Sequence, residues 1–563
     1  MYAHSIAGLA PCSGNELSHM TNLKIPRSVY VYGCAILLLA LGLTSPSLKV
    51  APRVSAQALA TTAPTSSPTQ ENTAVTAPIV LPAVNWQDVS DYRQAMKPAF
   101  ADDVQKFVDG NRYLIVATLT LDDQAATIHG AEHVRYTNHT ADSLNSVVFR
   151  LYPNSPMLDG KMTVADVTAN GESVQPGFSG QDSVMLIPLA KPVAPNDSVE
   201  MTMNFDLVME VNVDVSYGRF GYKENVVSGT AWYPTLSVYD KGQGWWTSMP
   251  DPKGDPAYSE SGLYDVRLTI PAKMPIVMTG KEISTTTNTD GSVTHRNVTG
   301  PVRDFAFMTS QRYTIDTEMV DGVEVRVVHY SDDNGNPPAL DGTSSALQFV
   351  RNAFSTYDAL FGEYPFAQFN VVENPTPSGV EYPGLIQVSE QAWQAGQSYL
   401  EIVISHETGH QWFYSLIGNN QVEHPWLDES LASYVEIVYT REVKHDPTIT
   451  AAYVKRFTDR YQGYLRLGGA DLALDLPVSS YSGVGYGAIV YSKGPLFYTL
   501  LEQRLGVQTV YKALNTYFHR YEYAVATSAD VEKVFEEVSG QDLTTLFQQE
   551  VYETTSTATA AAP

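Results

Sequence analysis

Residues 401–413 read EIVISHETGHQWF, and they place His406, Glu407 and His410 in an apolar stretch with helical spacing. Residues four apart on a helix lie on the same face. Two imidazoles arranged in this way can offer nitrogens to one zinc ion, while the glutamate between them points at water beside the metal. The stretch therefore predicts a zinc-binding helix that assists hydrolysis of a bond that the motif alone does not specify.

A catalytic zinc ion needs a third protein ligand, and Glu429 is the candidate for that role. It lies in the segment PWLDESLA at residues 425–432, where Pro425 can precede a second helix. Antiparallel packing of the two helices would bring Glu429 back towards both histidines. We predict one Zn2+ per chain, held by His406, His410 and Glu429. The alternative is that core or surface histidines match the motif by accident.

Glu407 is the expected general base. Zinc lowers the pKa of bound water towards about 7, so a nearby carboxylate can accept a proton while the water attacks a peptide carbonyl. The same carboxyl group can then pass this proton to the leaving amine.

The composition excludes several classes of site. The chain has 563 residues with 35 basic and 61 acidic side chains, a net charge of −26, and no long Lys/Arg cluster that could neutralise phosphates. We therefore expect no nucleic-acid partner. The two cysteines, Cys12 and Cys34, precede or lie inside an N-terminal apolar segment. Any zinc in the folded part must consequently be bound by histidines and carboxylates.

The N-terminal residues have the order of a targeting segment. Lys24 and Arg27 precede an apolar stretch at residues 29–43, which is typical of a signal peptide within residues 1–58. The alternative is an uncleaved signal anchor that tethers the chain to a membrane through residues 29–43. Met20 is a candidate for the true start. Both interpretations predict an extracytoplasmic protein, either secreted or membrane-anchored.

Residue patterns divide the rest of the chain into a linker and two domains. Residues 59–85 are rich in Ala, Thr and Pro, which predicts a disordered linker. Alternating apolar residues predict a β-rich domain over residues 86–317. Helical spacing predicts a mixed, mainly helical domain over residues 318–553, followed by a disordered tail at 554–563. The expected helices span residues 346–361, 400–417, 427–443, 448–466, 485–505, 507–520 and 528–536. The predicted fold class is α+β with several domains.

The zinc motif and its surroundings resemble those of the aminopeptidase N-like gluzincins, a family that includes leukotriene hydrolase-type enzymes. The segment WLDE at 426–429 fits this pattern. SGVEYPGL at 378–385 resembles the family's exopeptidase segment, and YSKG at 491–494 resembles its catalytic-tyrosine segment. The resemblance implies a saddle-like β-rich N-terminal domain followed by a thermolysin-like catalytic domain. It also implies a short form that lacks the family's C-terminal helical domain.

The resemblance implies that Glu381 binds the free α-amine of a peptide, while Gly379 and Val380 hold the peptide backbone. A loop glutamate in a Gly/Pro-rich turn is the alternative for Glu381. The family's second amine-binding residue comes from the β-rich domain, but SGTAWYP at 228–234 contains no acid or amide. Val380 and Ser378 also replace a Met and a Gly of the family pattern. Glu381 is thus left as the candidate amine anchor.

Three further residues receive roles from the resemblance. Tyr491 would donate its hydroxyl to the oxyanion that develops during the reaction, and Tyr486 would assist it. Glu436 would orient a zinc-binding histidine. Simple packing of either tyrosine, and a solvated helix-face carboxylate at Glu436, are the alternatives.

The predicted function is that of a zinc-dependent aminopeptidase acting on peptides with a free N-terminus. A gluzincin endopeptidase with an open cleft is the alternative with the same chemistry. A catalytically silent surface-binding module is the alternative from another class. The preferred N-terminal side chain and the oligomeric state are not predicted.

Overall fold

The computed structural model describes residues 79–211, 220–331, 342–375, 377, 379–395 and 397–554. The predicted targeting segment, linker residues 59–78, Ser378 and the tail from residue 555 lie outside the described residues. Within the described ranges, no helix has the length and apolar character needed to cross a membrane.

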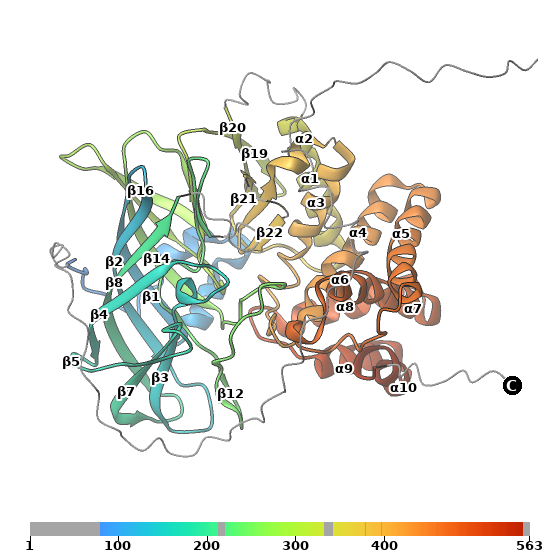
Figure 1. Ribbon diagram of the computed structural model, residues 1–563, viewed down its shortest axis with the longest axis horizontal. Helices are drawn as coiled ribbons and strands as arrows, with labels where there is room; N and C mark the ends of the chain where they lie inside the picture. Colours follow the sequence, from blue (N-terminus) through green and yellow to red (C-terminus); the bar gives the residue numbers. More distant parts are fainter. Residues whose placement is uncertain are drawn as a thin grey trace, which may run out of the picture. The chain divides into compact units, whose positions relative to one another are not determined.

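An eight-stranded sheet is the largest element of the β-rich part (Figure 1). In its long strands buried and less buried residues alternate, as in β2 and β8, because successive side chains of a strand point to opposite faces. In pairing order the strands are β16 (Lys281–Thr287), β17 (Val293–Val298), β14 (Gly262–Ile270), β1 (Asn111–Leu121), β2 (Ala125–Thr137), β8 (Ser198–Glu210), β4 (Lys161–Ala169) and β5 (Glu172–Ser173). β1 pairs in parallel with β14 and antiparallel with β2.

Three smaller sheets complete the described β-rich part. The first contains β15 (Ile276–Met278), β18 (Phe307–Thr309), β10 (Val226–Gly229) and β9 (Gly221–Lys223). The second contains β11 (Thr235–Leu236), β3 (Leu144–Arg150), β7 (Val184–Val193) and β6 (Gly177–Ser179), and the third contains β12 (Tyr239–Asp240) and β13 (Gly244–Trp245). Short 3-10 helices span Asp91–Ala95, Pro98–Phe107 and Tyr152–Asn154.

A five-stranded sheet begins the predicted catalytic domain, the catalytic part of the chain. Its pairing order is β19 (Tyr313–Val320), β20 (Val323–Tyr330), β21 (Gln368–Asn374), β23 (Leu385–Ser389) and β22 (Gly379–Tyr382). β22 is the edge strand and pairs antiparallel with β23. The sheet starts at Tyr313 and so reaches across the predicted domain boundary between residues 317 and 318.

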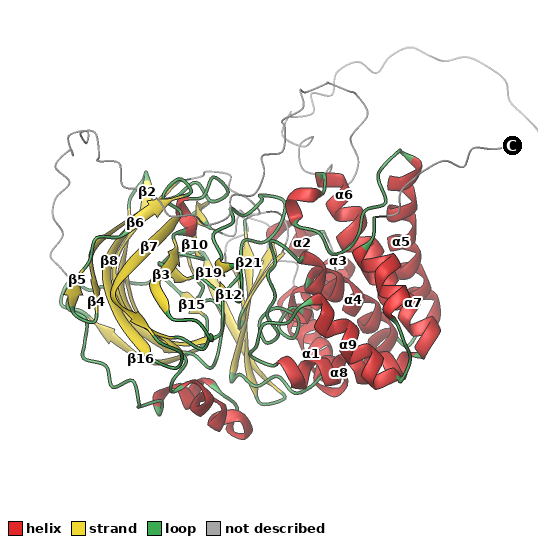
Figure 2. Ribbon diagram, turned by 90° about the horizontal axis from the view of Figure 1, so that it is seen from below, coloured by secondary structure: helices red, strands yellow, loops and turns green. Residues whose placement is uncertain are grey.

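Helices dominate the chain after this sheet. They are α1 (Gly342–Leu360), α2 (Glu390–Gln394), α3 (Gln397–Gly409), α4 (Glu429–Lys444), α5 (Pro447–Arg466), α6 (Gly483–Ala488), α7 (Gly494–Leu505), α8 (Val507–Tyr521), α9 (Ser528–Ser539) and α10 (Thr544–Phe547). Short helical turns span Pro425–Leu427, Val478–Ser480, Ile489–Lys493 and Gln548–Tyr552. Figure 2 shows the helices gathered on the side of the five-stranded sheet, and α3 contacts β22 and β23.

The predicted helix over residues 400–417 is wrong beyond residue 409. After Gly409 the chain turns, and Trp412 enters the core, where its indole N–H donates to the Gly362 carbonyl at 2.7 Å. Its ring packs against Phe354 and Tyr357 of α1. The spacing of apolar residues remains helical past Gly409. The helix nevertheless ends there, because the chain must turn to bury the Trp412 ring against α1.

Arg303 connects the β-rich part to the loop that follows α3. This buried guanidinium donates to the carbonyls of Tyr414 at 2.9 Å, Ser259 at 3.1 Å and Leu416 at 3.2 Å, and also to that of Ala524. Tyr414 has a φ of 147°, which is uncommon for a residue other than glycine. The bond from Arg303 therefore stabilises a strained residue of the loop.

We predict that Arg303→Met lowers the free energy of unfolding by about 3 kcal/mol or more, because several buried carbonyls lose their donor. Urea unfolding measures the difference. Arg520→Met is the matched control, since Arg520 pairs with Glu537 at 2.7 Å on the surface and should cost within about 1 kcal/mol. Equal losses in the two variants would contradict the structural role of Arg303.

Candidate metal centre

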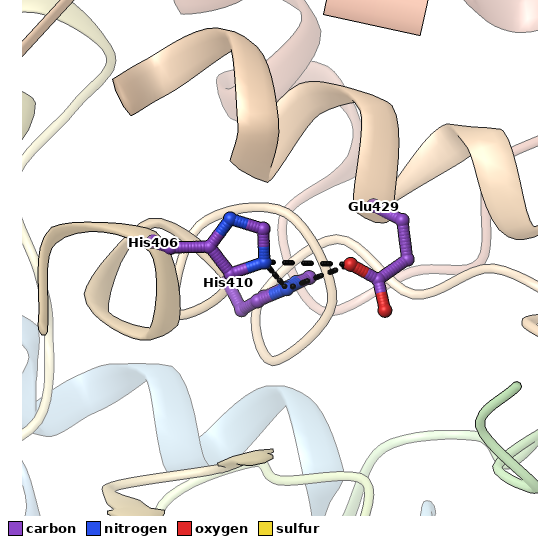
Figure 3. A group of neighbouring side chains, drawn as sticks. All are labelled: His406, His410 and Glu429. Atoms are coloured by element: carbon purple, nitrogen blue, oxygen red, sulfur yellow. Dashed lines mark hydrogen bonds and ion pairs between the residues drawn. The ribbon is translucent and has the colours of Figure 1, made fainter. Parts of the chain in front are cut away.

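Three predicted ligands meet between α3 and α4. His406 lies on α3, His410 directly follows its end, and Glu429 is the first residue of α4. The Nε2 atoms of the two histidines are 3.2 Å apart. Glu429 Oε2 lies 3.4 Å from His406 Nε2 and 3.5 Å from His410 Nε2. Figure 3 shows both rings pointing at the carboxylate.

Hydrogen bonds on the far side of each ring decide which nitrogen faces the centre. His406 Nδ1 lies 3.0 Å from Glu436 Oε1, and His410 Nδ1 lies 3.2 Å from the carbonyl oxygen of Phe413. Both partners accept hydrogen bonds, so each Nδ1 carries the proton and each Nε2 presents a lone pair. Glu429 Oε2 is buried without a donor. Three acceptor atoms that converge in this way fit a zinc ion.

A second group of possible ligands overlaps the first. Atoms of Glu381, Glu407 and His410 lie within 4.8 Å of one another. This group contains a single imidazole, whereas the first contains two, each already oriented by a bond at Nδ1. We therefore assign the metal to His406, His410 and Glu429, with Glu407 and Glu381 beside it.

Local features hold the two helices in this arrangement. Asp428 caps α4, since its Oδ1 accepts from the backbone N–H of Glu429 at 2.8 Å. A Cβ on Gly409 would overlap the side chain of Val435 on α4, so glycine permits the close approach of α3.

Glu436 is buried on α4 and is bonded to His406, so the alternative of a solvated carboxylate is wrong. Its second oxygen accepts from Arg456 at 3.3 Å. The residue thus stands where it can orient His406, the role that the family resemblance implies for it.

Glu407 is buried on α3 and faces β22. A Cβ on Gly379 would overlap its carboxylate, so a larger residue there would require the Glu407 side chain to move. Burial raises the pKa of Glu407 to about 8 in the absence of metal, against the opposing effect of His406 and His410, and a bound cation beside it would favour the ionised carboxylate.

Tyr491 reaches the metal centre from the π-helical turn Ile489–Lys493, between α6 and α7. Its hydroxyl donates to Glu429 Oε1, and its ring stacks on His406 with the centroids 6.3 Å apart. Tyr486 packs edge-on against Tyr491 at 5.5 Å. The sequence predicted one helix over 485–505, and the π-turn that interrupts it carries Tyr491, a location common for functional residues.

A pocket adjoins Glu381 on β22, with about 400 Å³ of space when the open solvent at its mouth is counted. Residues from both parts of the chain line it. They include Thr230, Ala231, Asp255 and Asp304 from the β-rich part, and Val380, Glu381, Tyr414 and Gln421 from the catalytic part. The segment 228–234 is therefore at the pocket, as expected, but the additional acids and the amide come from other segments. Sequence reasoning missed Asp255, Asp304 and Gln421, because no local motif marks them.

Comparison with known proteins identifies the domain that contains the candidate site. Residues 339–549 match the model of the Peptidase family M1 domain. The chain contains a peptidase family M1 domain. The predicted family resemblance is thereby confirmed, and residues 379–491, which hold the candidate site, fall inside the M1 domain.

Two curated relatives illustrate the extent of the match. Aminopeptidase M1-B from Oryza sativa subsp. japonica is 25% identical over 253 residues, which are 42% of this chain and 28% of the relative. Aminopeptidase N from Lactococcus lactis subsp. lactis is 26% identical over 161 residues, 28% of this chain and 19% of the relative. The chain thus spans less than a third of the length of either relative.

A solved structure matches a larger share of both chains than these curated relatives do. The M1 zinc metallopeptidase from Deinococcus radiodurans superimposes with a TM-score of 0.58 at 17% sequence identity, over 78% of this chain and 94% of that one. At this identity the likeness concerns the fold. The predicted α+β fold class, a β-rich domain followed by a mainly helical catalytic domain, is confirmed.

We predict that Glu436→Ala weakens zinc binding about 10- to 100-fold, because His406 loses the partner of its Nδ1. Competition with a chelator measures the zinc affinity. Glu442→Ala is the control on the same helix, since Glu442 accepts from Tyr511 instead of a histidine. Unchanged affinity in Glu436→Ala would remove the residue from the metal site.

Proposed function

We propose that this protein is a zinc aminopeptidase that removes residues from the N-terminus of peptides. The observation that carries the proposal is the convergence of two imidazoles and a carboxylate, with Glu407 and Glu381 beside them. Relatives that are themselves aminopeptidases, and the M1 domain, support the same class of reaction.

His406, His410 and Glu429 would hold the metal. When bound, zinc supplies a Lewis acid that polarises a carbonyl oxygen and lowers the pKa of water. Glu436 and the Phe413 carbonyl keep both histidines in the tautomer that ligation requires.

Glu407 would move the proton. Its carboxylate lies with His410 in the cluster of atoms within 4.8 Å, where it can accept a proton from attacking water. Delivery of that proton to the leaving nitrogen completes the transfer. Gly379 leaves the space that the carboxylate occupies at this position.

Glu381 supports cleavage from the peptide end. Its carboxylate belongs to the same 4.8 Å cluster as Glu407 and His410. A terminal ammonium would offset the burial of this charge, whereas an internal peptide bond offers no positive charge. The endopeptidase alternative requires Glu381 to point away from the centre, so its observed position favours an aminopeptidase.

Tyr491 would stabilise the negative charge that develops on the carbonyl oxygen. Its hydroxyl is close enough to the centre to bond Glu429, and it must leave this bond in order to donate to substrate. Gly379 and Val380 on the edge strand β22 would pair with the peptide backbone. Tyr486 would support the ring of Tyr491, and packing alone is an equally sufficient explanation of its position.

The test is hydrolysis of a panel of aminoacyl chromogenic substrates by the full chain. We expect turnover that a chelator abolishes and that zinc restores, with no cleavage of N-acetylated peptides. Efficient cleavage of an N-acetylated peptide would favour the endopeptidase. Absence of stoichiometric zinc together with absence of turnover would favour the silent binding module.

Glu407→Gln should lower kcat about 10²- to 10⁴-fold, because the amide cannot accept the proton. Zinc content should stay at one per chain, since Glu407 is not a ligand of the assigned site. Metal analysis and steady-state kinetics measure the two quantities on one sample. Retained turnover at full zinc occupancy would contradict the role of Glu407.

A further inference from the structure

Gln421 presents a buried acceptor without a donor. The side chain lines the pocket beside Glu381 and is 1% exposed, and its Oε1 has no hydrogen-bond partner. Buried polar atoms of native proteins are nearly always hydrogen-bonded, and an exception in a pocket points to a ligand. The missing partner must be a hydrogen-bond donor, because Oε1 can only accept.

The orientation of this amide follows from its other contacts. Nε2 donates to Glu381 Oε1 at 2.9 Å and to Asp428 Oδ2 at 2.6 Å, which uses both of its hydrogens. The flipped amide would place its carbonyl oxygen against two carboxylates. The network therefore determines that Oε1 is the atom left for a ligand.

The charges around Oε1 indicate that the missing donor is a cation. Glu381 and Asp304 line the same pocket, and none of its described lining residues is Lys, Arg or His. Arg303 precedes Asp304 in the chain but donates to backbone carbonyls. Burial raises the pKa of Asp304 to about 6, so this carboxyl is largely ionised near pH 7.5. Buried carboxylates of this kind are stabilised by a positive partner.

We propose that Gln421 is a second anchor of the substrate's α-ammonium group. Its Oε1 accepts a hydrogen bond from the ammonium, while Glu381, held in place by Gln421 Nε2, balances the charge. The inference rests on the proposed function. It supplies, from the catalytic part of the chain, the anchor that segment 228–234 lacks.

A purely structural role would use only the Nε2 side of the residue. Gln421 would then brace Glu381 against Asp428, the cap of α4, and its replacement would lower the preference for an amino group only through Glu381. Direct contact with the ammonium predicts a further loss of preference when Gln421→Met is added to a chain that already carries Glu381→Gln. The two roles can therefore be told apart by the ratio of the affinities for a ligand with an amino group and for the same ligand without it.

The experiment measures binding of two ligands to the zinc-loaded full chain by calorimetry. L-leucinol carries the amino group and is not hydrolysed, and 4-methylpentan-1-ol is the same molecule without it. We expect wild type to prefer L-leucinol and Gln421→Met to lower this preference about tenfold, the value of a hydrogen bond to a charged group. An unchanged preference in Gln421→Met, or a loss in Glu381→Gln that Gln421→Met does not increase, would overturn the proposal.

Gln368→Met is the matched control, because Gln368 is a buried glutamine on β21 outside the described pocket lining. Its preference should equal that of wild type. If Gln421→Met does not fold, Gln421→Ala gives the same readout without placing an apolar group against two carboxylates. If Glu381→Gln loses the preference and the Gln421 variants keep it, this inference is wrong and the proposed function stands. If wild type shows no preference for L-leucinol and no hydrolysis of aminoacyl substrates, the proposed function is wrong as well.

Discussion

The structure around the candidate site depends on one constraint. Three hydrogen-bond acceptor atoms lie close together with no donor between them. The Nε2 atoms of His406 and His410 and the Oε2 atom of Glu429 lie 3.2–3.5 Å apart. Such an arrangement is repulsive unless a cation occupies it. The close packing of α3 on α4, the cap at Asp428 and the bond from His406 to Glu436 all hold these atoms in place.

The same principle recurs at the neighbouring pocket. There the unpaired oxygen of Gln421 and the carboxylates of Glu381 and Asp304 leave an excess of acceptors over donors. Both places therefore favour positive charge, a metal ion in one and an ammonium group in the other. Arg303 connects the β-rich part to the loop after α3 through hydrogen bonds to backbone carbonyls.

Local periodicity explains what the sequence could predict. Helical spacing placed His406 and His410 on one face, and the need for a third zinc ligand pointed to Glu429, whereas the role of Glu436 was implied by the family resemblance. The end of this helix at Gly409 could not be predicted, because it depends on the packing of Trp412 against α1, which is distant in the sequence. Asp304 and Gln421 are distant in sequence from Glu381 and follow no motif. Only the tertiary structure shows that they share its pocket.

Zinc K-edge X-ray absorption on the purified full chain tests the metal assignment most directly. We predict one zinc per chain whose spectrum contains the scattering of two imidazole rings, as ligation by His406, His410 and Glu429 requires. His406→Ala should reduce this signal to a single imidazole. A spectrum with one imidazole in wild type, as Glu381, Glu407 and His410 would produce, would contradict the assignment, as would a chain that binds no zinc.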